Sequence, residues 1–353
     1  MNSFEYVFPA IRGLQAGREY YVSMCPLTLI PKVFLFDEEE ISPELRAQRI
    51  LNRSRVPEIA SYLVDNKHDY VFSAITASID GPVHFSPLGD SGEANRVGAL
   101  HVDMSSKFVI NDGQHRRAAI ESAIQKEPSL GNETIAVVFF VDQGLKRSQQ
   151  MFADLNRHAV KPSKSLGLLY DHRNESSNVS RQVAISSTAF QGMVEMEKTT
   201  LAERSKKLFT LSAIHSGCVE LLGACLDGVV SNEFVADKQI KICCEFWEQV
   251  ALQIPEWQLV KQSKLSAGEV RRDYIHSHAI TLQALGVVGA QLLSERPKTW
   301  KKDLQELSRI NWSRANVSVW EGRALVGGRV SKASNNVTLT TNFIKNRLGL
   351  ELS

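Results

Sequence analysis

Residues 108–120 read FVINDGQHRRAAI, and this stretch decides how the first half of the chain is expected to fold. The apolar run through Ile110 is typical of a strand, and it breaks at Asn-Asp-Gly before a helix that carries His-Arg-Arg in its first turn. A strand-to-helix turn leaves free backbone N–H groups at the positive end of the helix dipole, and Gly113 lets a ligand approach the backbone closely. The stretch therefore predicts an anion site for a phosphate group.

The turn supplies both backbone and side-chain ligands for this phosphate. We assign Gly113 and the N–H groups of Gln114 and His115 to the phosphate oxygens. Arg116 and Arg117 are the predicted charge partners, because the guanidinium group suits bidentate phosphate contacts. An arginine committed to a ligand contributes little to folding, so loss of Arg116 is expected to leave thermal stability nearly unchanged.

Two residues of the turn could also take part in catalysis. Asp112 could hold a metal ion or orient a water molecule, and His115 could titrate near neutral pH as an acid or base. The structural alternative is an ordinary helix start, in which Asp112 or Asn111 caps the helix and Arg117 forms an exposed pair with Glu121. The residues of the turn leave both interpretations open.

A second motif follows at residues 151–165, which read MFADLNRHAVKPSKS. Its polar residues are unusually dense for a connector and come directly after an apolar helix face. Asn156 is predicted to point toward the turn at Gly113. Lys161 and Lys164, with Arg173 further along the chain, could line a DNA surface, because local positive charge attracts the phosphate backbone.

The two motifs together resemble a known family. Residues 112–116 resemble the DGQHR signature of DndB, a family of regulatory proteins of bacterial DNA sulfur modification (phosphorothioation), and residues 151–165 are similar to its second conserved stretch. The likeness runs from about residue 6 to about residue 348. That family is in turn similar to the ParB/sulfiredoxin superfamily, in which a glycine-containing turn followed by paired basic residues holds nucleotide phosphates.

The resemblance implies a fold and a function. It implies an α+β protein with a ParB/sulfiredoxin-like mixed α/β N-terminal domain, and a role as a repressor that binds double-stranded DNA. In nucleotide-hydrolysing ParB relatives a helix asparagine contributes to nucleotide and metal binding, and Asn156 resembles that residue in position. Sulfiredoxin has its catalytic cysteine where this chain has Gln114, so thiol chemistry at the turn is excluded and no redox cofactor is expected.

Composition limits the other classes of function. The 353 residues carry a net charge of +2 and the pI is about 8.2, so any nucleic-acid surface must be local. Five cysteines without a Cys-x-x-Cys pair suit a reducing compartment better than a disulfide framework, and Cys25 is expected to be a buried apolar residue. No signal peptide or membrane span is recognisable, which predicts a cytoplasmic protein with no membrane partner.

The chain is expected to form two domains, residues 1–164 and 165–353. In the first, predicted strands cover 4–11, 18–24, 32–36, 70–79, 97–102, 108–110 and 135–141. Predicted helices cover 44–64, where Pro57 starts a second helix, 114–126 and 146–156. The second is mainly helical, with predicted helices at 164–170, 181–192, 207–223, 237–252 and 269–293. The apolar stretch 279–293 is interpreted as a core helix.

The last block, residues 310–348, combines tryptophans, glycines and basic residues. It predicts a small hairpin followed by a helix that Thr341 caps. Arg323, Arg329 and Lys332 are opposed only by Glu321, so a hairpin with an exposed aromatic residue is a candidate contact to the DNA backbone. The alternative is a solubilising surface with Trp312 and Trp320 in the core. The segments 181–191 and 203–216 are one candidate pair of DNA-recognition helices.

Two functions of different classes remain open on the sequence alone. In the first, a homo-oligomeric repressor binds the promoter region of sulfur-modification genes, with other proteins of that system as possible partners. In the second, the turn binds and hydrolyses ATP or another nucleoside triphosphate with Mg²⁺. Arg116 and Arg117 then stabilise phosphate charge, Asp112 holds the metal, and the nucleotide state controls DNA binding.

Overall fold

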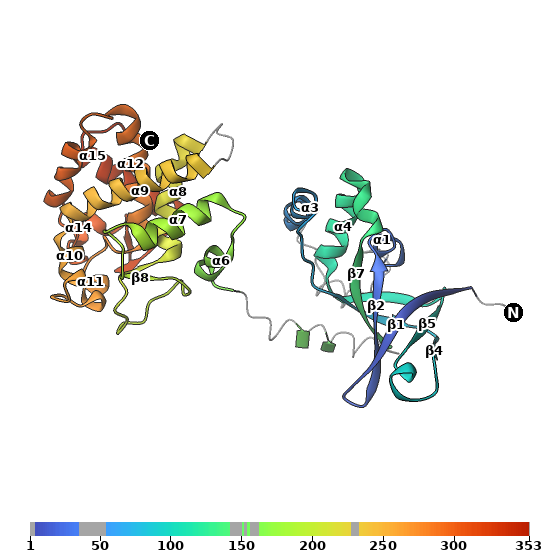
Figure 1. The fold of residues 1–353 in the computed structure, drawn as a ribbon. Helices are drawn as coiled ribbons and strands as arrows, with labels where there is room; N and C mark the ends of the chain where they lie inside the picture. Colours follow the sequence, from blue (N-terminus) through green and yellow to red (C-terminus); the bar gives the residue numbers. More distant parts are fainter. Residues whose placement is uncertain are drawn as a thin grey trace. The chain divides into compact units, whose positions relative to one another are not determined.

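The computed structural model describes residues 4–34, 54–141, 150–151, 154–155, 162–226 and 233–352. The chain forms two compact units, Met1–Val160 and Lys161–Ser353 (Figure 1). The predicted boundary after residue 164 lies just inside the second unit. Each unit is described by itself below.

A seven-stranded mixed sheet forms the centre of the first unit. Its strands lie in the order β4-β5-β1-β2-β7-β3-β6, and all neighbours are antiparallel except β3 and β7, which are parallel. The strands are β1 (Glu5–Gln15), β2 (Arg18–Pro26), β3 (Ile75–Asp80), β4 (Val83–Pro87), β5 (Val97–Asp103), β6 (Lys107–Asp112) and β7 (Thr134–Val141). The strands predicted at 97–102, 108–110 and 135–141 are confirmed.

Helices cover one face of this sheet. They are α1 (Ile30–Val33), α3 (Arg55–Asp65) and α4 (Gln114–Lys126), with 3-10 turns η1 (Gly92–Asn95) and η2 (Pro128–Asn132). Figure 1 shows α1, α3 and α4 on the same side of the strands. Ala119, Ile120 and Ala123 of α4 are fully buried against a core that includes Phe139, as the helical spacing predicts. Cys25 is also buried, which confirms its interpretation as an apolar core residue.

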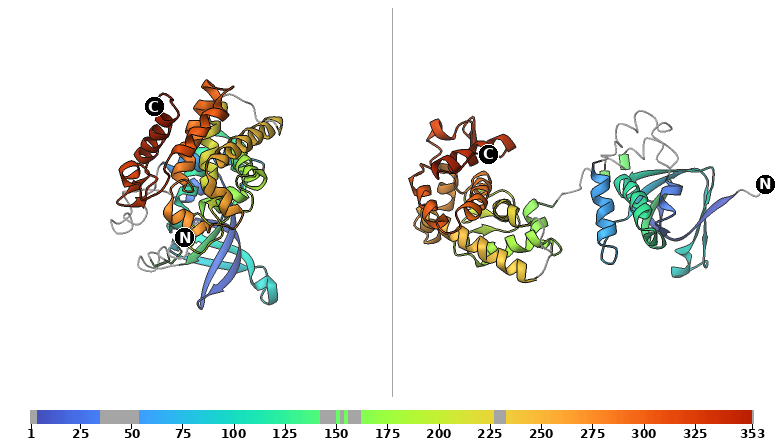
Figure 2. Two further views of the ribbon diagram at one scale, coloured as in Figure 1. Left: turned by 90° about the vertical axis from the view of Figure 1, so that its left-hand side faces the viewer. Right: turned by 90° about the horizontal axis from the view of Figure 1, so that it is seen from above.

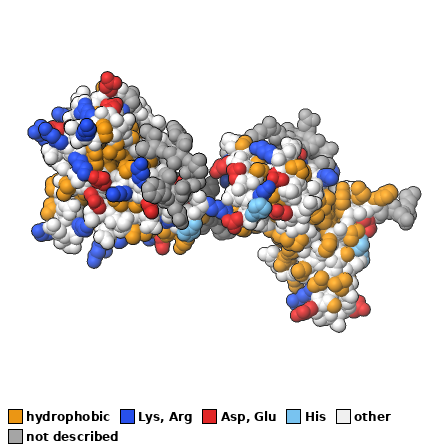
Figure 3. Space-filling model, turned by 45° about the horizontal axis from the view of Figure 1, so that its top comes forward, with side chains coloured by type: hydrophobic (Ala, Val, Ile, Leu, Met, Phe, Trp, Pro, Cys, Tyr) orange, Lys and Arg blue, Asp and Glu red, His pale blue; other side chains and the backbone are white. Residues whose placement is uncertain are grey.

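The opposite face of the sheet is apolar as well. Val7, Ile11 and Met24 alternate with core residues along β1 and β2, because neighbouring side chains of a strand point to opposite faces. They are 56%, 57% and 57% exposed. Figure 3 shows a broad hydrophobic area on this unit. An antiparallel sheet with one solvated face usually carries polar residues there, so this face is a feature to explain.

The second unit is mainly helical, as predicted. Its helices are α6 (Lys164–Tyr170), α7 (Glu175–Ser186), α8 (Leu211–Leu226), α9 (Glu233–Gln253), α10 (Pro255–Lys261), α11 (Ala267–Asp273), α12 (Ala279–Glu295), α13 (Trp300–Asp303), α14 (Val317–Trp320) and α15 (Ser334–Arg347), with one 3-10 turn η3 (Leu304–Arg309). Two short strand pairs are β8 (Val194–Glu195) with β9 (Phe209–Thr210), and β10 (Leu325–Val326) with β11 (Arg329–Val330).

Helix α12 is the central helix of this unit and confirms the predicted core helix. It packs between α8 and α15, and Figure 2 gives two further views of this arrangement. The α8 and α12 backbones approach closely at two glycines: a Cβ atom built on Gly286 would lie 2.3 Å from the Gly217 carbonyl oxygen. No helix formed by the described residues is long and apolar enough to cross a membrane.

Several predicted elements are wrong. Residues 30–33 form helix α1 instead of the start of a strand, with Pro31 in its first turn, where a fixed φ favours a helix. The single helix predicted at 269–293 is two helices, because Tyr274 takes an extended conformation and pairs with Ser313. Helix α15 begins at Ser334, so Thr341 lies in its middle and is buried, and it caps nothing.

Candidate functional site

The predicted turn lies between β6 and α4, and its backbone has the predicted form. Gly113 has φ +117°, a left-handed conformation that side chains rarely adopt. A Cβ atom at this position would also come within 3.0 Å of Ile75 Cγ1. Gly113 occupies the N-cap position, and no side chain caps the helix. The prediction that Asp112 or Asn111 serves as the cap is therefore wrong: Asn111 donates instead to Ser78 Oγ on the neighbouring strand, at 2.7 Å.

Arg116 lies against this turn and takes part in the fold. Its Nη2 donates to Asp112 Oδ2 at 2.9 Å and to the Ala74 carbonyl oxygen at 3.1 Å. Its buried Nε has no hydrogen-bond partner among the described residues. A buried N–H without a partner costs free energy, so this donor, beside the first-turn N–H groups of α4, is available to an anion. Because two of its contacts are structural, we expect loss of Arg116 to lower stability, contrary to the prediction from the sequence.

Arg117 is not a solvated residue. It is 8% exposed, and its Nε donates to the Phe34 carbonyl oxygen while Nη2 donates to that of Pro31. Nη1 pairs with Glu121 Oε2 at 2.5 Å. The predicted pair with Glu121 exists, but it is not fully exposed, because only the glutamate is open to solvent. All three groups of the guanidinium have protein partners, so Arg117 holds the α1 segment against α4.

His115 lies in a positive environment. Burial lowers its pKa first, and the nearby charges of Arg55 and Arg116 lower it further, whereas Asp112 raises it. Arg55 is the first residue of α3, which packs beside α4. Arg55, His115 and Arg116 therefore gather at the start of α4, and neutral His115 is favoured over the charged form. Arg55 is not among the site residues predicted from the sequence, although it belongs to a run of arginines at 46, 49, 53 and 55.

The other residues predicted to bind a ligand at the turn differ in what the structure shows of them. Gln114 is buried and its Nε2 donates to the Ile110 carbonyl oxygen at 3.3 Å. As the first residue of α4 it has a backbone N–H with no acceptor within the helix. Asp112 is engaged by Arg116. Among the described residues, no group of three or more His, Cys, Asp or Glu side chains could hold a metal ion. The predicted Asn156 lies outside the described residues, as does Lys161.

A second basic site lies in the helical unit. Ser163 caps α6 by accepting from the Leu166 N–H at 3.1 Å, which makes Lys164 the first helical residue. The next residue, Ser165, is fully buried and its Oγ accepts from the Ser212 N–H at the start of α8. This contact ties the start of α6 to α8 and places Lys164 near the basic residues there.

Three basic side chains from three elements form what we call the positive patch: Lys164 of α6, His215 of α8 and Lys332 just before α15. Lys332 Nζ donates to Ser216 Oγ at 2.9 Å, and His215 Nδ1 lies 3.0 Å from Ser180 Oγ. Burial is the first cause of the lowered pKa of His215 and of Lys332, and the Lys164 charge is the second cause for both. The three groups therefore repel one another, and a bound anion would relieve that repulsion.

Of the remaining basic residues predicted to contact DNA, some are exposed and others are partly or fully buried. Arg329 in β11 and Arg173 are exposed, so both remain candidates. Arg323 is half-buried: its Nη1 donates to the Val319 carbonyl oxygen at 2.5 Å, and its guanidinium lies 5.5 Å from the Phe343 ring centre. Lys345 is 5% exposed. The basic block of the C-terminus therefore offers fewer free charges than its sequence indicates.

The exposed aromatic residue predicted for the hairpin is absent from it. Trp312 and Trp320 stack at 5.6 Å in the core, and their indole N–H groups donate to backbone carbonyl oxygens. The alternative, tryptophans in the core, is confirmed. The predicted pair of recognition helices is wrong as well, because residues 203–208 are not helical and Arg181 is buried, donating to the carbonyl oxygens of Leu168 and Asp171.

Comparison with protein families gives one result. The family DndB, described as DNA-sulfur modification-associated, matches residues 8–351, nearly the whole chain. No curated protein and no solved structure matches the chain. The match therefore rests on the family pattern over both units.

Proposed function

The chain belongs to the DndB family of DNA-sulfur modification-associated proteins, and from this membership we propose that it is a cytoplasmic DNA-binding repressor of DNA phosphorothioation genes. The observation that carries the proposal is the positive patch of Lys164, His215 and Lys332. Phosphate contacts supply most of the non-specific affinity for DNA. The role of the family in DNA sulfur modification and the preference of the positive patch for anions both support DNA as the ligand.

The patch is suited to the DNA backbone rather than to base edges. Among the described residues, no salt bridge joins Lys164 or Lys332 to a carboxylate. Neither lysine therefore has to break an ion pair before it binds a phosphate group. The exposed side chain of Arg329 is a further candidate contact. Contacts of this kind fix the position of a protein on the duplex and carry no sequence information. Recognition of a promoter therefore requires further contacts, from this chain, a second copy of it or another protein of the modification system.

The binding experiment uses a duplex from the promoter region of the sulfur-modification genes and a shuffled duplex of equal length. Fluorescence anisotropy gives the affinity for each. We expect tighter binding to the promoter duplex, and the double variant Lys164→Ala, Lys332→Ala is expected to weaken binding to both duplexes. Lys298→Ala removes an exposed lysine outside the patch and serves as the matched control. Equal affinity of the wild type for the two duplexes would contradict the repressor assignment.

A second candidate function is nucleotide binding at the turn of residues 112–116. What supports it is the unpartnered Nε of Arg116 beside the uncapped first turn of α4, with Arg55 and His115 adding positive character. The same arrangement, a glycine turn followed by basic residues, supports the proposed relation of the first unit to the ParB/sulfiredoxin superfamily. A nucleotide bound here would control DNA affinity if it prefers one conformation of the protein.

The side chains described at this turn are better suited to bind a phosphate group than to bind Mg²⁺. Asp112 is the predicted ligand of Mg²⁺, but its carboxylate pairs with Arg116. A magnesium site at this turn would need oxygen ligands that the described residues do not gather. We therefore keep phosphate binding as the proposal for the turn and derive no hydrolytic step from it.

Calorimetric titration with ATP, GTP and CTP, each with and without Mg²⁺, tests this second candidate. Arg55→Ala is the informative variant, because it removes a charge near His115 from an exposed residue. It is expected to weaken binding about tenfold, as loss of one charge contact does, whereas Arg96→Ala, an exposed arginine elsewhere on the unit, is expected to have no effect. Absence of binding by all three nucleotides would leave the turn with a structural role alone.

A further inference from the structure

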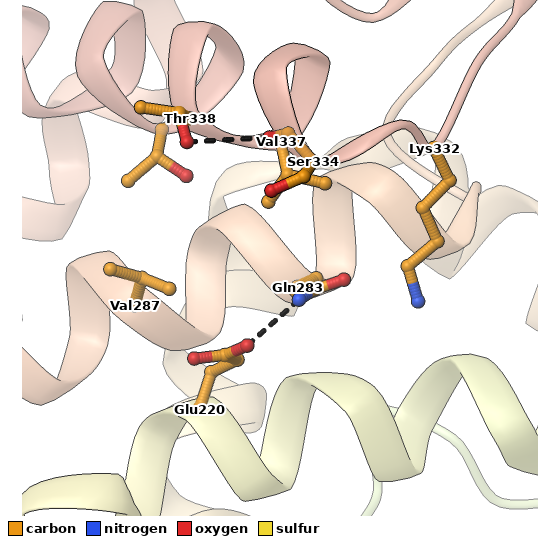
Figure 4. A pocket seen from close by; sticks show the side chains of 8 residues that line it. Glu220, Gln283, Val287, Lys332, Ser334, Val337 and Thr338 are labelled. Carbon is orange, nitrogen blue, oxygen red and sulfur yellow. Dashed lines mark hydrogen bonds between the residues drawn. The ribbon is translucent and has the colours of Figure 1, made fainter. Parts of the chain in front are cut away.

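A pocket in the helical unit adjoins the positive patch and shares Lys332 with it. Helices α8, α12 and α15 and the segment before α15 enclose it, and its volume is about 440 Å³ (Figure 4). Small-molecule sites in proteins have volumes of roughly 300 to 1,000 Å³. The pocket is therefore large enough for a small organic ligand, and its lining decides which kind.

One end of the pocket favours an anion. Lys332 supplies an ammonium group, and the first helical residue of α15, Ser334, lies beside it (Figure 4). No side chain caps α15, a helix of 14 residues, so its first N–H groups have no cap at the positive end of the helix dipole. Thr341 also lines the pocket. It is 3% exposed and adds a buried hydroxyl group to the lining.

The other end favours hydrogen-bond donors. Gln283 Nε2 donates to Glu220 Oε1 at 2.7 Å across the interface of α12 and α8 (Figure 4). This bond fixes both side chains and leaves the second carboxylate oxygen of Glu220 and the amide oxygen of Gln283 as acceptors. Val287 and Val337 add an apolar surface to the lining. A ligand that fits therefore carries an anionic group, an apolar ring or chain, and hydroxyl or amine donors.

We propose that this pocket binds a mononucleotide, with its phosphate at Lys332 and the start of α15 and its sugar or base donors on Glu220 and Gln283. A carboxylate that accepts from ribose hydroxyls is a general way of holding a nucleotide, and the valines offer a surface for the base. Lys332 belongs to both the pocket and the positive patch. A bound phosphate would therefore compete with DNA for the same ammonium group, and the mononucleotide would act as a releasing effector.

The binding test uses the full chain and calorimetric titration with AMP, GMP, CMP and UMP. Inorganic phosphate and adenosine are separate probes of the two ends. At least one mononucleotide is expected to bind with micromolar affinity, at least tenfold more tightly than either fragment. Glu220→Gln removes the carboxylate acceptor and also a negative charge that acts on Lys332, so it is expected to weaken the mononucleotide at least tenfold without weakening inorganic phosphate. Lys298→Ala, an exposed basic residue outside the lining, is expected to leave both affinities unchanged.

Two results would overturn the proposal. One is that no mononucleotide binds at millimolar concentration to the folded chain. The other is that a mononucleotide binds and neither Glu220→Gln nor Lys332→Ala weakens it. The result can be distinguished from failure of the DNA proposal, because Glu220→Gln keeps all three basic side chains of the positive patch and removes a negative charge near Lys332. Its DNA affinity without nucleotide is therefore expected not to fall below that of the wild type.

Discussion

At the scale of single residues, arginines of one motif have different roles. Arg116 and Arg117 are adjacent and were both expected to bind phosphate, yet Arg117 is buried and fully engaged by carbonyl oxygens and Glu121. A sequence gives residue type and helical spacing, which predicted the Arg117–Glu121 pair. It does not give the carbonyl oxygens of Pro31 and Phe34, more than eighty positions upstream, which determine that Arg117 is structural.

The contacts of Arg116 predict a loss of stability when it is replaced. Arg116→Ala removes an ion pair with half-exposed Asp112 and a hydrogen bond to the Ala74 carbonyl oxygen. We expect the free energy of unfolding of the first unit to fall by roughly 1 to 3 kcal/mol. Far-UV circular dichroism during urea unfolding measures it, with Arg96→Ala as control. Wild-type stability of Arg116→Ala would mean that these two contacts contribute nothing.

Buried histidines predict that the helical unit is sensitive to acid. Burial lowers the pKa of His215, His276 and His278 below the ordinary 6.5. His276 Nδ1 accepts a hydrogen bond from Trp257 Nε1, so this contact requires the unprotonated nitrogen. A histidine whose folded pKa is lowered binds more protons when unfolded. Stability is therefore complete above pH 6.5 and is lost as pH falls from 6.5 through the lower folded values.

Tryptophan fluorescence measures this effect in the second unit alone, because all five tryptophans lie there. Urea unfolding at pH 7.5 and pH 5.5 is expected to show a loss of up to about 1.4 kcal/mol per histidine and pH unit below 6.5. His276→Gln keeps an acceptor for Trp257 and removes one titrating group, so its loss between the two pH values is expected to be smaller. An equal or larger loss in this variant would contradict the role of His276.

At the scale of elements, local sequence patterns predicted the helices whose bounds do not depend on tertiary contacts. Helix α4 was predicted from the break at Gly113 and α6 from its apolar spacing, and both have the expected bounds. The last helix was misplaced because Thr341 is a good capping residue by type, whereas the start of α15 depends on tertiary contacts. Asn336 in its first turn donates to the carbonyl oxygens of Gly322 and Arg323 and accepts from Ser331, which joins the helix to the hairpin.

The crossing of α8 and α12 gives a prediction about element packing. Gly286→Ala places a Cβ atom 2.3 Å from the Gly217 carbonyl oxygen, so the two helices must separate. We expect a loss of roughly 1 to 3 kcal/mol in tryptophan-monitored unfolding. Gly223→Ala on α8 is the matched control: nothing lies within 4 Å of its Cβ position, and a gain of up to about 1 kcal/mol follows from helix propensity. A change of the same sign in the free energy of unfolding of both variants would contradict the close approach of α8 and α12.

At the scale of the whole molecule, we propose that the exposed apolar sheet face binds a second copy of the chain. A homodimer is the state that a palindromic DNA site requires, and Val7, Ile11 and Met24 offer an apolar surface for it. The sequence predicts a homo-oligomer but gives no position for its interface. Apolar side chains lie on both faces of β1, so the sequence alone does not indicate which face is buried. The structure shows that the core lies on the face that the helices cover.

Ile11→Asp tests this interface. A charge on an exposed strand position is expected to leave the fold intact and to shift the chain from dimer to monomer, because burying an unpaired carboxylate in an interface is costly. Analytical ultracentrifugation gives the mass of wild type and variant, with Gln15→Asp at the end of the same strand as control. A monomeric wild type, or a variant as dimeric as the wild type, would remove the sheet face as the interface.

The central claim is that the positive patch binds the DNA backbone, and the salt dependence of DNA affinity tests it most directly. Each lost phosphate contact lowers the slope of log affinity against log salt by about 0.9. Lys164→Ala combined with Lys332→Ala is expected to reduce this slope by about 1.8, while Lys298→Ala is expected to leave it unchanged. A double variant with the slope and affinity of the wild type would contradict the account.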